Sequence, residues 1–255
     1  MDTKLAAPFA NQAKAHDAAE IIRNCVHCGF CTATCPTYQL LGDESDSPRG
    51  RIYLIRQLLE TGTANTKSRL HLDRCLLCRS CETTCPSGVQ YGQLLETGRE
   101  LLEQVNPRPG INTLRRKLVA RSLVQTPLIK ALVKTGVRAR NWLPGGLSKQ
   151  LPEQWPEEAW PIDRHARKML VLDGCVQSSL SPVTNLAGAE VLDRLGISLL
   201  REDPAGCCGA VGLHTNDRDR GLTHAKQRID AWWPQIERGI EAIIFTASGC
   251  GVTIK

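Results

Sequence analysis

The sequence lacks the features that would place it in a bilayer or let it bind a dinucleotide. No apolar stretch approaches the ~20 residues that cross a membrane, so any membrane association is expected to be peripheral. The first 20 residues hold no apolar segment of the kind found in secretory signals. No G-x-G-x-x-G follows a predicted strand, so the chain is not expected to bind a flavin or nicotinamide itself.

Cysteine, by contrast, is abundant, with 12 among 255 residues, and eight of the 12 form two similar runs. One run reads CVHCGFCTATCP from Cys25 to Pro36, and the other reads CLLCRSCETTCP from Cys75 to Pro86. Both follow C-x2-C-x2-C-x3-C-P, and each cysteine of the second run lies 50 residues after its counterpart. This spacing is the bacterial signature of [4Fe–4S] ligands. The sequence therefore predicts two [4Fe–4S] clusters.

The spacing has a physical basis. A C-x2-C loop lets two thiolates converge on one metal centre while backbone N–H groups turn toward the sulfurs, and the third cysteine reaches another corner. The fourth is carried away, and the proline ends its local helix. In two-cluster ferredoxins this fourth cysteine binds the other cluster. The predicted ligands are therefore crossed: Cys25, Cys28, Cys31 and Cys85 for the first cluster, and Cys75, Cys78, Cys81 and Cys35 for the second.

Two other uses of these cysteines are less favoured than iron–sulfur clusters. Structural zinc sites usually combine two C-x2-C pairs across a longer gap, whereas each run here packs four cysteines into 11 residues. A disulfide framework needs an oxidising compartment, which the missing secretory signal argues against.

The N-terminal third has helical patterns and no strand signal. Residues 1–13 are expected to be a loose tail, and helices are predicted at 14–24, 66–73 and 89–105. Another helix is predicted from Pro48, with Ser47 as its N-cap and Gly62 as its end. We therefore expect an all-α, twin-cluster ferredoxin-type domain over residues 1–105.

Three residues near the first run have two interpretations each. Arg49 and Arg51 either lower the negative charge around the first cluster or belong to an ordinary helix surface. His27 lies inside the first loop, where it is expected to tune or pack rather than to ligate, because the cysteines already suffice.

Residues 106–166 are predicted to join two domains. The part from Asn106 to Trp142 has nine basic residues and no acidic one. The rest of the chain has 23 basic and 26 acidic residues, so this part makes the protein basic. Helices broken at Pro127 are expected here, with an apolar stripe beside the basic residues. This part either docks on anionic lipid, or is a solvated face or a surface for an acidic partner, which we favour. Residues 141–163 are expected to form a linker that packs against both domains.

The pattern changes to alternating strands and helices over residues 167–255. Strands are predicted in KMLVLDGC, ISLLRE and EAIIFTASGC, with helices from Ser181 to Leu195 and over 215–238 between them. This alternation predicts a parallel sheet with crossover helices. The whole chain is therefore expected to be an α+β multidomain protein, with a helical domain followed by an α/β domain.

The four remaining cysteines all follow predicted strands: Cys175, Cys207, Cys208 and Cys250. Sites in parallel sheets lie beyond the carboxyl ends of the strands, so these cysteines are expected to gather at one edge. Gly206 and Gly209 would let the backbone of Cys207-Cys208 approach a metal closely. They form either a candidate third iron–sulfur or metal site or a glycine-rich turn with inert, buried cysteines.

The order GC, GCCGA and SGCG after successive strands resembles the cysteine-rich CCG domain. This domain occurs in heterodisulfide reductase subunits and in iron–sulfur subunits of complexes that oxidise hydroxyacids. The segment CVHCGFCTATCPTYQLLGDESDSPRGRIYLIRQLLETG, followed by a CCG domain, resembles the iron–sulfur subunit of bacterial glycolate oxidase (glycolate dehydrogenase). The resemblance covers essentially the whole chain.

The resemblance implies an electron relay with no catalytic residue of its own. FAD-containing subunits would oxidise glycolate to glyoxylate, and this chain would pass single electrons toward a membrane quinone. It implies a cytoplasmic protein, peripheral at the inner face of the membrane at most, and no nucleic-acid partner. Related subunits serve lactate utilisation and anaerobic glycerol-3-phosphate oxidation, and a heterodisulfide-reductase-like thiol enzyme or a zinc-stabilised interaction module are further alternatives.

Two departures from the family pattern concern the third site. Position 253 is threonine where the family's first CCG repeat often has the second cysteine of a C-x2-C. The family also carries a second CCG repeat, whereas this sequence ends at Lys255. We therefore expect a truncated chain with an incomplete set of ligands for a third cluster.

Overall fold

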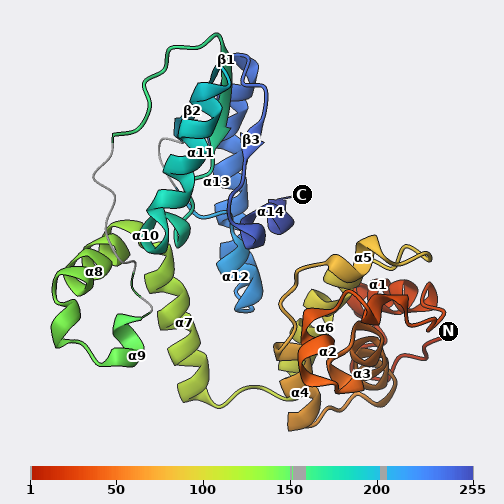
Figure 1. The fold of residues 1–255 in the computed structure, drawn as a ribbon. Coiled ribbons are helices and arrows are strands. Elements are labelled where there is room, and N and C mark those ends of the chain that lie inside the picture. Colours follow the sequence, from red (N-terminus) through yellow and green to blue (C-terminus); the bar gives the residue numbers. More distant parts are fainter. Residues whose placement is uncertain (1, 150, 152–158, 202–205, 255) are drawn as a thin grey trace. The chain divides into compact units, whose positions relative to one another are not determined.

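The computed structural model describes residues 2–149, 151, 159–201 and 206–254. The chain forms two compact units, Met1–Thr113 and Leu114–Lys255. In Figure 1 the first unit is helical and the second holds the strands. The predicted fold class, a helical domain followed by an α/β domain with a short parallel sheet, is confirmed. The finer division at residues 105 and 166 stays a prediction, and residues 150 and 152–158 of the expected linker lie outside the described residues.

Short and long helices alternate in the first unit. Its elements are α1 (Ala13–Arg23), η1 (Phe30–Thr32), α2 (Pro36–Leu41), η2 (Glu44–Asp46), α3 (Pro48–Thr61), α4 (Thr66–Asp73), α5 (Ser80–Thr83) and α6 (Tyr91–Val105). Each cysteine run lies between helices, so the run before α2 and the run before α6 are held by helical segments on both sides. The four helices predicted in this region are all present.

Helix α3 shows how the local sequence sets its ends. The Ser47 side chain accepts a hydrogen bond from the Gly50 N–H at 2.9 Å, and Pro48 occupies the first turn. Gly62 ends the helix in a left-handed conformation (φ 68°), and its N–H donates to the Leu58 carbonyl. A Cβ at Gly50 would lie 1.9 Å from the Glu44 carbonyl oxygen, so only glycine allows η2 to pack this closely against α3.

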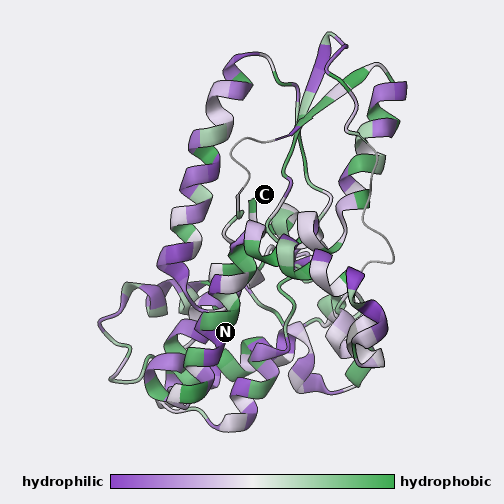
Figure 2. Cartoon of the chain, turned by 90° about the vertical axis from the view of Figure 1, so that its left-hand side faces the viewer, coloured by the Kyte–Doolittle hydropathy of each residue, from purple (hydrophilic) through white to green (hydrophobic). Residues whose placement is uncertain are grey.

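The core of the first unit lies between α1, α3 and α6. Its fully buried side chains are Ile22 from α1, Ile55 and Leu59 from α3, and Leu94, Leu95 and Leu101 from α6. Figure 2 shows that helices of the chain carry both hydrophobic and hydrophilic residues, as expected for helices with one buried face. The helical periodicity of the sequence thus places the core correctly.

The expectation of a loose N-terminal tail is wrong from Leu5 onward. Phe9 has no exposed surface, and Leu5 packs against the same core. The Ala6 N–H also donates to the Leu59 carbonyl at 2.8 Å. The Phe9 ring stabilises the packing of this segment against the core, because its burial removes a large apolar area from water.

The second unit begins with helices that carry the basic residues. Helix α7 (Gly110–Val124) starts in the first unit, and α8 (Thr126–Arg138), η3 (Arg140–Trp142) and α9 (Gly145–Ser148) follow. The predicted apolar stripe is largely exposed, at 56% for Leu118 and 59% for Leu132. The linker expectation is wrong for Trp142, which is 92% exposed, whereas the Trp160 indole donates to the Leu199 carbonyl at 2.8 Å. Trp155 lies outside the described residues.

The sheet is parallel, in the order β2-β1-β3. Its strands and the elements around it are β1 (Arg167–Val171), α10 (Gln177–Leu180), α11 (Pro182–Arg194), β2 (Ile197–Arg201), α12 (Ala210–His214), α13 (Arg218–Glu237), β3 (Ile243–Ile244) and α14 (Ser248–Ile254). The third predicted strand is thus shorter than expected, and α14 follows it.

Successive residues of β1 face opposite sides of the sheet, as the pleat requires. Leu170 packs with Trp232 of α13, while Val171 packs with Ala189 of α11. The sheet is therefore covered by one helix on each side, which leaves the ends of the strands for the cysteine loops.

Phe9 should contribute strongly to the stability of the first unit. We expect Phe9→Ala to lower the free energy of unfolding by about 3–5 kcal/mol, because the change leaves a cavity in the core. Anaerobic chemical denaturation of both proteins measures the difference. Leu40→Ala, at a side chain that is 84% exposed, is the control and should change little. A loss below about 1 kcal/mol for Phe9→Ala would show that the N-terminal segment is not part of the core.

Candidate metal centres

The two cysteine runs repeat one backbone conformation. His27 and Leu77, each two residues after the first cysteine of its run, both have positive φ, at 55° and 53°. Gly29 and Arg79, between the second and third cysteines, also have positive φ, at 85° and 57°. Left-handed residues other than glycine are rare and concentrate at functional sites. They curl each loop so that its cysteines face inward.

Backbone N–H groups in these loops turn toward sulfur. The Leu77 N–H lies 3.4 Å from Cys75 Sγ. Burial raises the pKa of Cys25, and the His27 N–H at the corresponding position of the first run opposes this effect. Such donors stabilise thiolate ligands and the negative charge of a cluster.

Each of two cavities in the first unit takes cysteines from both runs. The first cavity is lined by Cys25, Cys28, Cys31, Cys81 and Cys85. The second is lined by Cys35, Cys75, Cys78 and Cys81. The fourth cysteine of each run thus lies with the first three cysteines of the other run. Cys81 lies between the cavities, and Pro48 and Tyr91 line both.

The residues around both cavities fit iron–sulfur clusters. All 12 cysteines are free thiols in the structure. Burial raises the pKa of Cys31 and, more strongly, of Cys81. Several thiols crowded into one buried space are unfavourable as free thiolates, whereas bound iron would offset their charge. Four soft sulfur donors per cavity are the ligands that [4Fe–4S] clusters use.

A fully buried ion pair borders the second cavity. Arg51 and Asp46 have no exposed surface, and Arg51 Nη2 lies 3.1 Å from Asp46 Oδ1. Arg51 Nε donates to the His71 carbonyl at 2.7 Å, and Nη1 donates to Thr37 Oγ1 at 3.0 Å. Burial alone would lower the pKa of Arg51, but its acidic neighbours Cys75, Cys35 and Asp46 raise it. The guanidinium is therefore a permanent buried cation.

The expectation for the two arginines of α3 needs correction for Arg51. It lines the second cavity, not the first, and is not part of the helix surface. Arg49 does line the first cavity, where it pairs with Glu44 and remains 36% exposed. The two residues face different sites because they are two positions apart on one helix. His27 is exposed and lines the first cavity.

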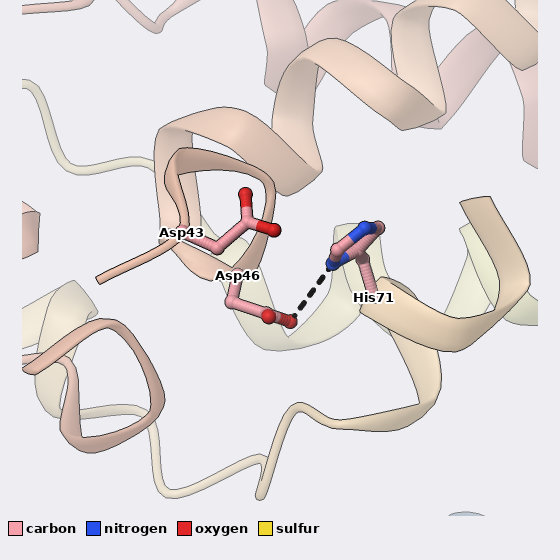
Figure 3. A group of neighbouring side chains, drawn as sticks. All are labelled: Asp43, Asp46 and His71. Atoms are coloured by element: carbon pink, nitrogen blue, oxygen red, sulfur yellow. Dashed lines mark ion pairs between the residues drawn. The ribbon is translucent and has the colours of Figure 1, made fainter. Parts of the chain in front are cut away.

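Asp43, Asp46 and His71 lie close enough to suggest a cation site (Figure 3). The carboxylate of Asp46 is already engaged, however, by Arg51 at Oδ1 and by Arg74 at Oδ2, 2.8 Å away. Asp43 accepts the Ser45 N–H at 2.8 Å, which caps η2. These contacts explain the group as an ion network in which both oxygens of Asp46 already contact guanidinium groups.

The structure brings the four other cysteines together beyond the sheet. Cys175 follows β1, Cys207 and Cys208 precede α12, and Cys250 lies in α14; the first three are almost completely buried. Thiol hydrogen bonds join Cys175 to Cys207, Cys207 to Cys208 and Cys208 to Cys250. Cys175 and Cys208 donate hydrogen bonds to Cys207. These bonds lower the pKa of Cys207 and raise the pKa of the two donors. The four sulfurs thus form a chain of pairwise contacts, and no three of them lie within 4.8 Å of one another. Sulfur is a soft donor of the kind that binds iron–sulfur clusters.

Three contributors to the first unit's sites were missed by sequence reasoning. Thr37 Oγ1 lies 3.2 Å from Cys35 Sγ, and the fully buried Tyr91 hydroxyl lies 3.8 Å from Cys75 Sγ. Burial raises the pKa of Tyr91 well above its usual value, so the hydroxyl keeps its proton. The third is the Arg51–Asp46 pair. Nothing in the sequence marks Thr37 or Tyr91, but an arginine shortly after a cysteine run could have been paired with the acidic segment before it.

Comparisons with known proteins agree with this division of the chain. Residues 21–89 match the 4Fe-4S dicluster domain family, and residues 169–255 match the cysteine-rich (CCG) domain family. The chain thus joins an iron–sulfur domain to a cysteine-rich domain, and the prediction of iron–sulfur clusters is confirmed. No solved structure matches the chain.

Three relatives extend the similarity beyond single domains. The glycolate oxidase iron-sulfur subunit of Escherichia coli (strain K12) is 52% identical over 100% of this chain and 63% of its own length. The probable glycolate oxidase iron-sulfur subunit of Bacillus subtilis (strain 168) is 30% identical over 92% of the chain and 58% of its own length. A dihydromethanophenazine:CoB–CoM heterodisulfide reductase polypeptide of Methanosarcina mazei is 25% identical over 89% and 55%. The chain therefore spans about three fifths of the length of these relatives.

Paired alanine substitutions test the crossed ligands. Cys28→Ala/Cys35→Ala removes one ligand from each predicted cluster and should deplete the iron of both. Cys35→Ala/Cys78→Ala removes two ligands from the second cluster alone and should deplete roughly half of the iron held by the two runs. Anaerobic iron and sulfide analysis, with electron paramagnetic resonance of the reduced protein, measures both. If each run held its own cluster, the two double variants would give the opposite results.

Proposed function

Because the chain joins a 4Fe-4S dicluster domain to a cysteine-rich domain and is similar along its whole length to glycolate oxidase iron–sulfur subunits, we propose that it is the electron-transfer subunit of a glycolate-oxidising complex. Cys25, Cys28, Cys31 and Cys85 would hold one [4Fe–4S] cluster, and Cys75, Cys78, Cys81 and Cys35 the other. The observation that carries the proposal is that each cavity takes sulfurs from both runs.

The chain's own residues supply ligands, burial and hydrogen bonds. When bound, the clusters take up and release single electrons. The cysteines hold the iron, the left-handed turns aim N–H groups at sulfur, and Thr37 and Tyr91 place hydroxyls beside Cys35 and Cys75. The crossed ligands hold both sites within one small unit, which favours short steps for the electron. No residue of this chain is assigned a part in breaking the C–H bond of the substrate.

We place the substrate chemistry in partner subunits that carry FAD, and the final acceptor in the membrane quinone pool. The absence of a dinucleotide fingerprint from the sequence supports this division of labour. No nucleic acid is expected among the partners. Glycolate is favoured over lactate or glycerol 3-phosphate because two of the similar proteins are named for it.

The cysteine-rich unit is proposed to hold a third site. Cys175, Cys207, Cys208 and Cys250 form one chain of thiol contacts, and the Gly209 N–H lies 3.4 Å from Cys207 Sγ. The similarity to a heterodisulfide reductase polypeptide favours a second candidate function, thiol–disulfide chemistry at the same cysteines. In the leading proposal this site is a further electron carrier. In the second, its thiols react with a disulfide substrate.

The basic helices α7 and α8 are proposed to contact an acidic face of a partner subunit. No helix among the described residues is long and apolar enough to cross a membrane. Arg115, Arg116 and Lys117 lie within one turn of α7, next to exposed Leu114 and Leu118. Such a surface combines charge with apolar area and suits a protein partner. The cytoplasmic location, at most peripheral to the membrane, is part of this proposal.

Substrate-dependent bleaching tests the relay. We expect glycolate to bleach the iron–sulfur absorbance of the protein purified anaerobically with its native partners, ahead of D-lactate and glycerol 3-phosphate. Bleaching by another substrate would overturn the glycolate assignment and keep the relay. Intact absorbance with no bleaching by any of them would contradict the relay. Cys207→Ser in the same assay should keep the bleaching, whereas the thiol-enzyme alternative requires that turnover of a disulfide substrate disappears in this variant.

Vesicle binding tests the assignment of the basic surface. We expect little co-sedimentation with vesicles of neutral or anionic lipid at physiological salt, because an acidic protein face is the proposed partner. Arg115→Gln/Arg116→Gln/Lys117→Gln should instead weaken co-purification of the partner subunits. Salt-sensitive binding to anionic vesicles that the triple variant loses would assign the surface to the membrane.

A further inference from the structure

The two cavities differ in the charges and donors that face their sulfurs. The second cavity has a fully buried cation, Arg51, in its wall, and its Nη1 lies 4.0 Å from Cys35 Sγ. Thr37 and Tyr91 place hydroxyls beside two positions of the same sulfur set, at Cys35 and Cys75. Two hydroxyls and one guanidinium therefore lie beside the sulfurs of this site.

The ion network around Arg51 has a buried pair at its centre: Arg51 and Asp46 are fully buried, whereas Arg74 is 40% exposed and Asp43 is exposed. Arg51 and Arg74 both contact the single carboxylate of Asp46, and His71 Nδ1 lies 3.1 Å from the same group (Figure 3). Two guanidinium groups thus share one negative charge. Arg79, which also lines the second cavity, is paired with Glu82 and adds no net charge.

The first cavity has no such cation among the residues that the structure describes around it. Its arginine, Arg49, is about one third exposed and paired with Glu44, so solvent and the carboxylate both weaken its field. Its guanidinium lies over the Gly29 backbone, where a Cβ would be 2.6 Å from Nη1. No side-chain hydroxyl or guanidinium donates to Cys25, Cys28, Cys31 or Cys85 in the described contacts.

We propose that Arg51 is a tuning residue that gives the site of Cys35, Cys75, Cys78 and Cys81 the higher midpoint potential, so that an electron entering the chain settles there. The inference rests on the proposed crossed ligands. One electron adds one negative charge to a site that is already anionic, and no proton or bond change is needed for the balance. Both arginines are paired with a carboxylate, but Arg51 is fully buried and Arg49 is 36% exposed, so Arg51 stabilises the added charge more because the interior screens it less.

The order of potentials gives the relay a direction. An electron passes from the site with the lower potential to the site with the higher one, so the first cavity would receive electrons and the second would hold them. The donor would then approach the loop of Cys25 to Cys31, and the acceptor would approach the loop of Cys75 to Cys81. Cys28 and Cys78 are the exposed cysteines of their loops and mark these two approaches.

Potentiometric titration followed by electron paramagnetic resonance tests the proposal on the purified chain with its clusters. The wild type should show two reduction steps. In Arg51→Met the midpoint potential of the upper step should fall by at least about 59 mV, which is a tenfold change in the equilibrium constant for one electron. The potential of the lower step should not change. Thr37→Val removes the hydroxyl beside Cys35 without a change of charge, and should lower the potential of the upper step by less.

Arg56→Met is the matched control. Arg56 lies on the same helix, α3, and is paired with Glu60 away from both cavities, so its loss changes the net charge equally but should leave both steps unmoved. Iron and sulfide contents equal to wild type show that a variant still holds both clusters. Arg51→Met leaves Asp46 without this partner, so two further variants are measured with it. Thr37→Val leaves the ion pair in place, and Arg51→Lys keeps the charge and should restore most of the midpoint potential.

The outcomes separate this inference from the function on which it rests. Two clusters with an upper step that neither Arg51→Met nor Thr37→Val lowers would overturn the tuning role and leave the relay intact. A fall in the lower step alone would reverse the proposed order. Absence of two clusters in the wild type would overturn the ligand assignment itself, before any potential is compared.

Discussion

Crowding four thiols into one partly buried cavity is the constraint on which the N-terminal unit depends. Burial raises the pKa of Cys25, Cys31 and Cys81, because a thiolate loses its hydration there. The chain offsets this cost with backbone dipoles, and for that purpose it holds His27 and Leu77 in left-handed conformations that few residues adopt. Bound iron would remove the rest of the cost. Ligand binding and folding of this unit are therefore expected to be coupled.

The same constraint explains why an ion pair is buried where apolar residues would suffice for stability. Burial costs several kcal/mol per ion, and the attraction within a pair often does no more than offset it. Arg51 also donates to the His71 carbonyl and to Thr37 Oγ1, and Arg74 contacts the other oxygen of Asp46, so the pair is fixed from several sides. Stability alone therefore does not account for the pair, whereas the proposed effect on the neighbouring sulfur site would.

Local signals in the sequence were sufficient for much of the fold and for part of the sites. Ser47, Pro48 and Gly62 act within one turn of helix, and the strand–helix alternation after Arg167 requires only periodicity, so both could be predicted. The burial of Phe9 and the position of Arg51 depend on contacts between segments far apart in sequence, which periodicity does not report. The repeat of the cysteine spacing indicated eight ligands; which side chains donate to their sulfurs became visible only in three dimensions.

The two units solve the problem of gathering sulfur in different ways. In the first, repeated loops exchange cysteines, so each cavity depends on both halves of the unit. In the second, parallel strands bring Cys175, Cys207 and Cys208 to one end of the sheet, and α14 adds Cys250. In the first unit, the exchanged cysteines complete each set of four sulfurs. In the second unit, the set ends with Cys250 on α14, which follows β3 at the edge of the sheet. The residues at that edge, rather than the sheet, therefore decide how many ligands the cysteine-rich site offers. Thr253 lies on α14, the helix that carries Cys250, and its hydroxyl donates to the Gly249 carbonyl. It supplies no sulfur, so any further ligand must come from outside the four cysteines.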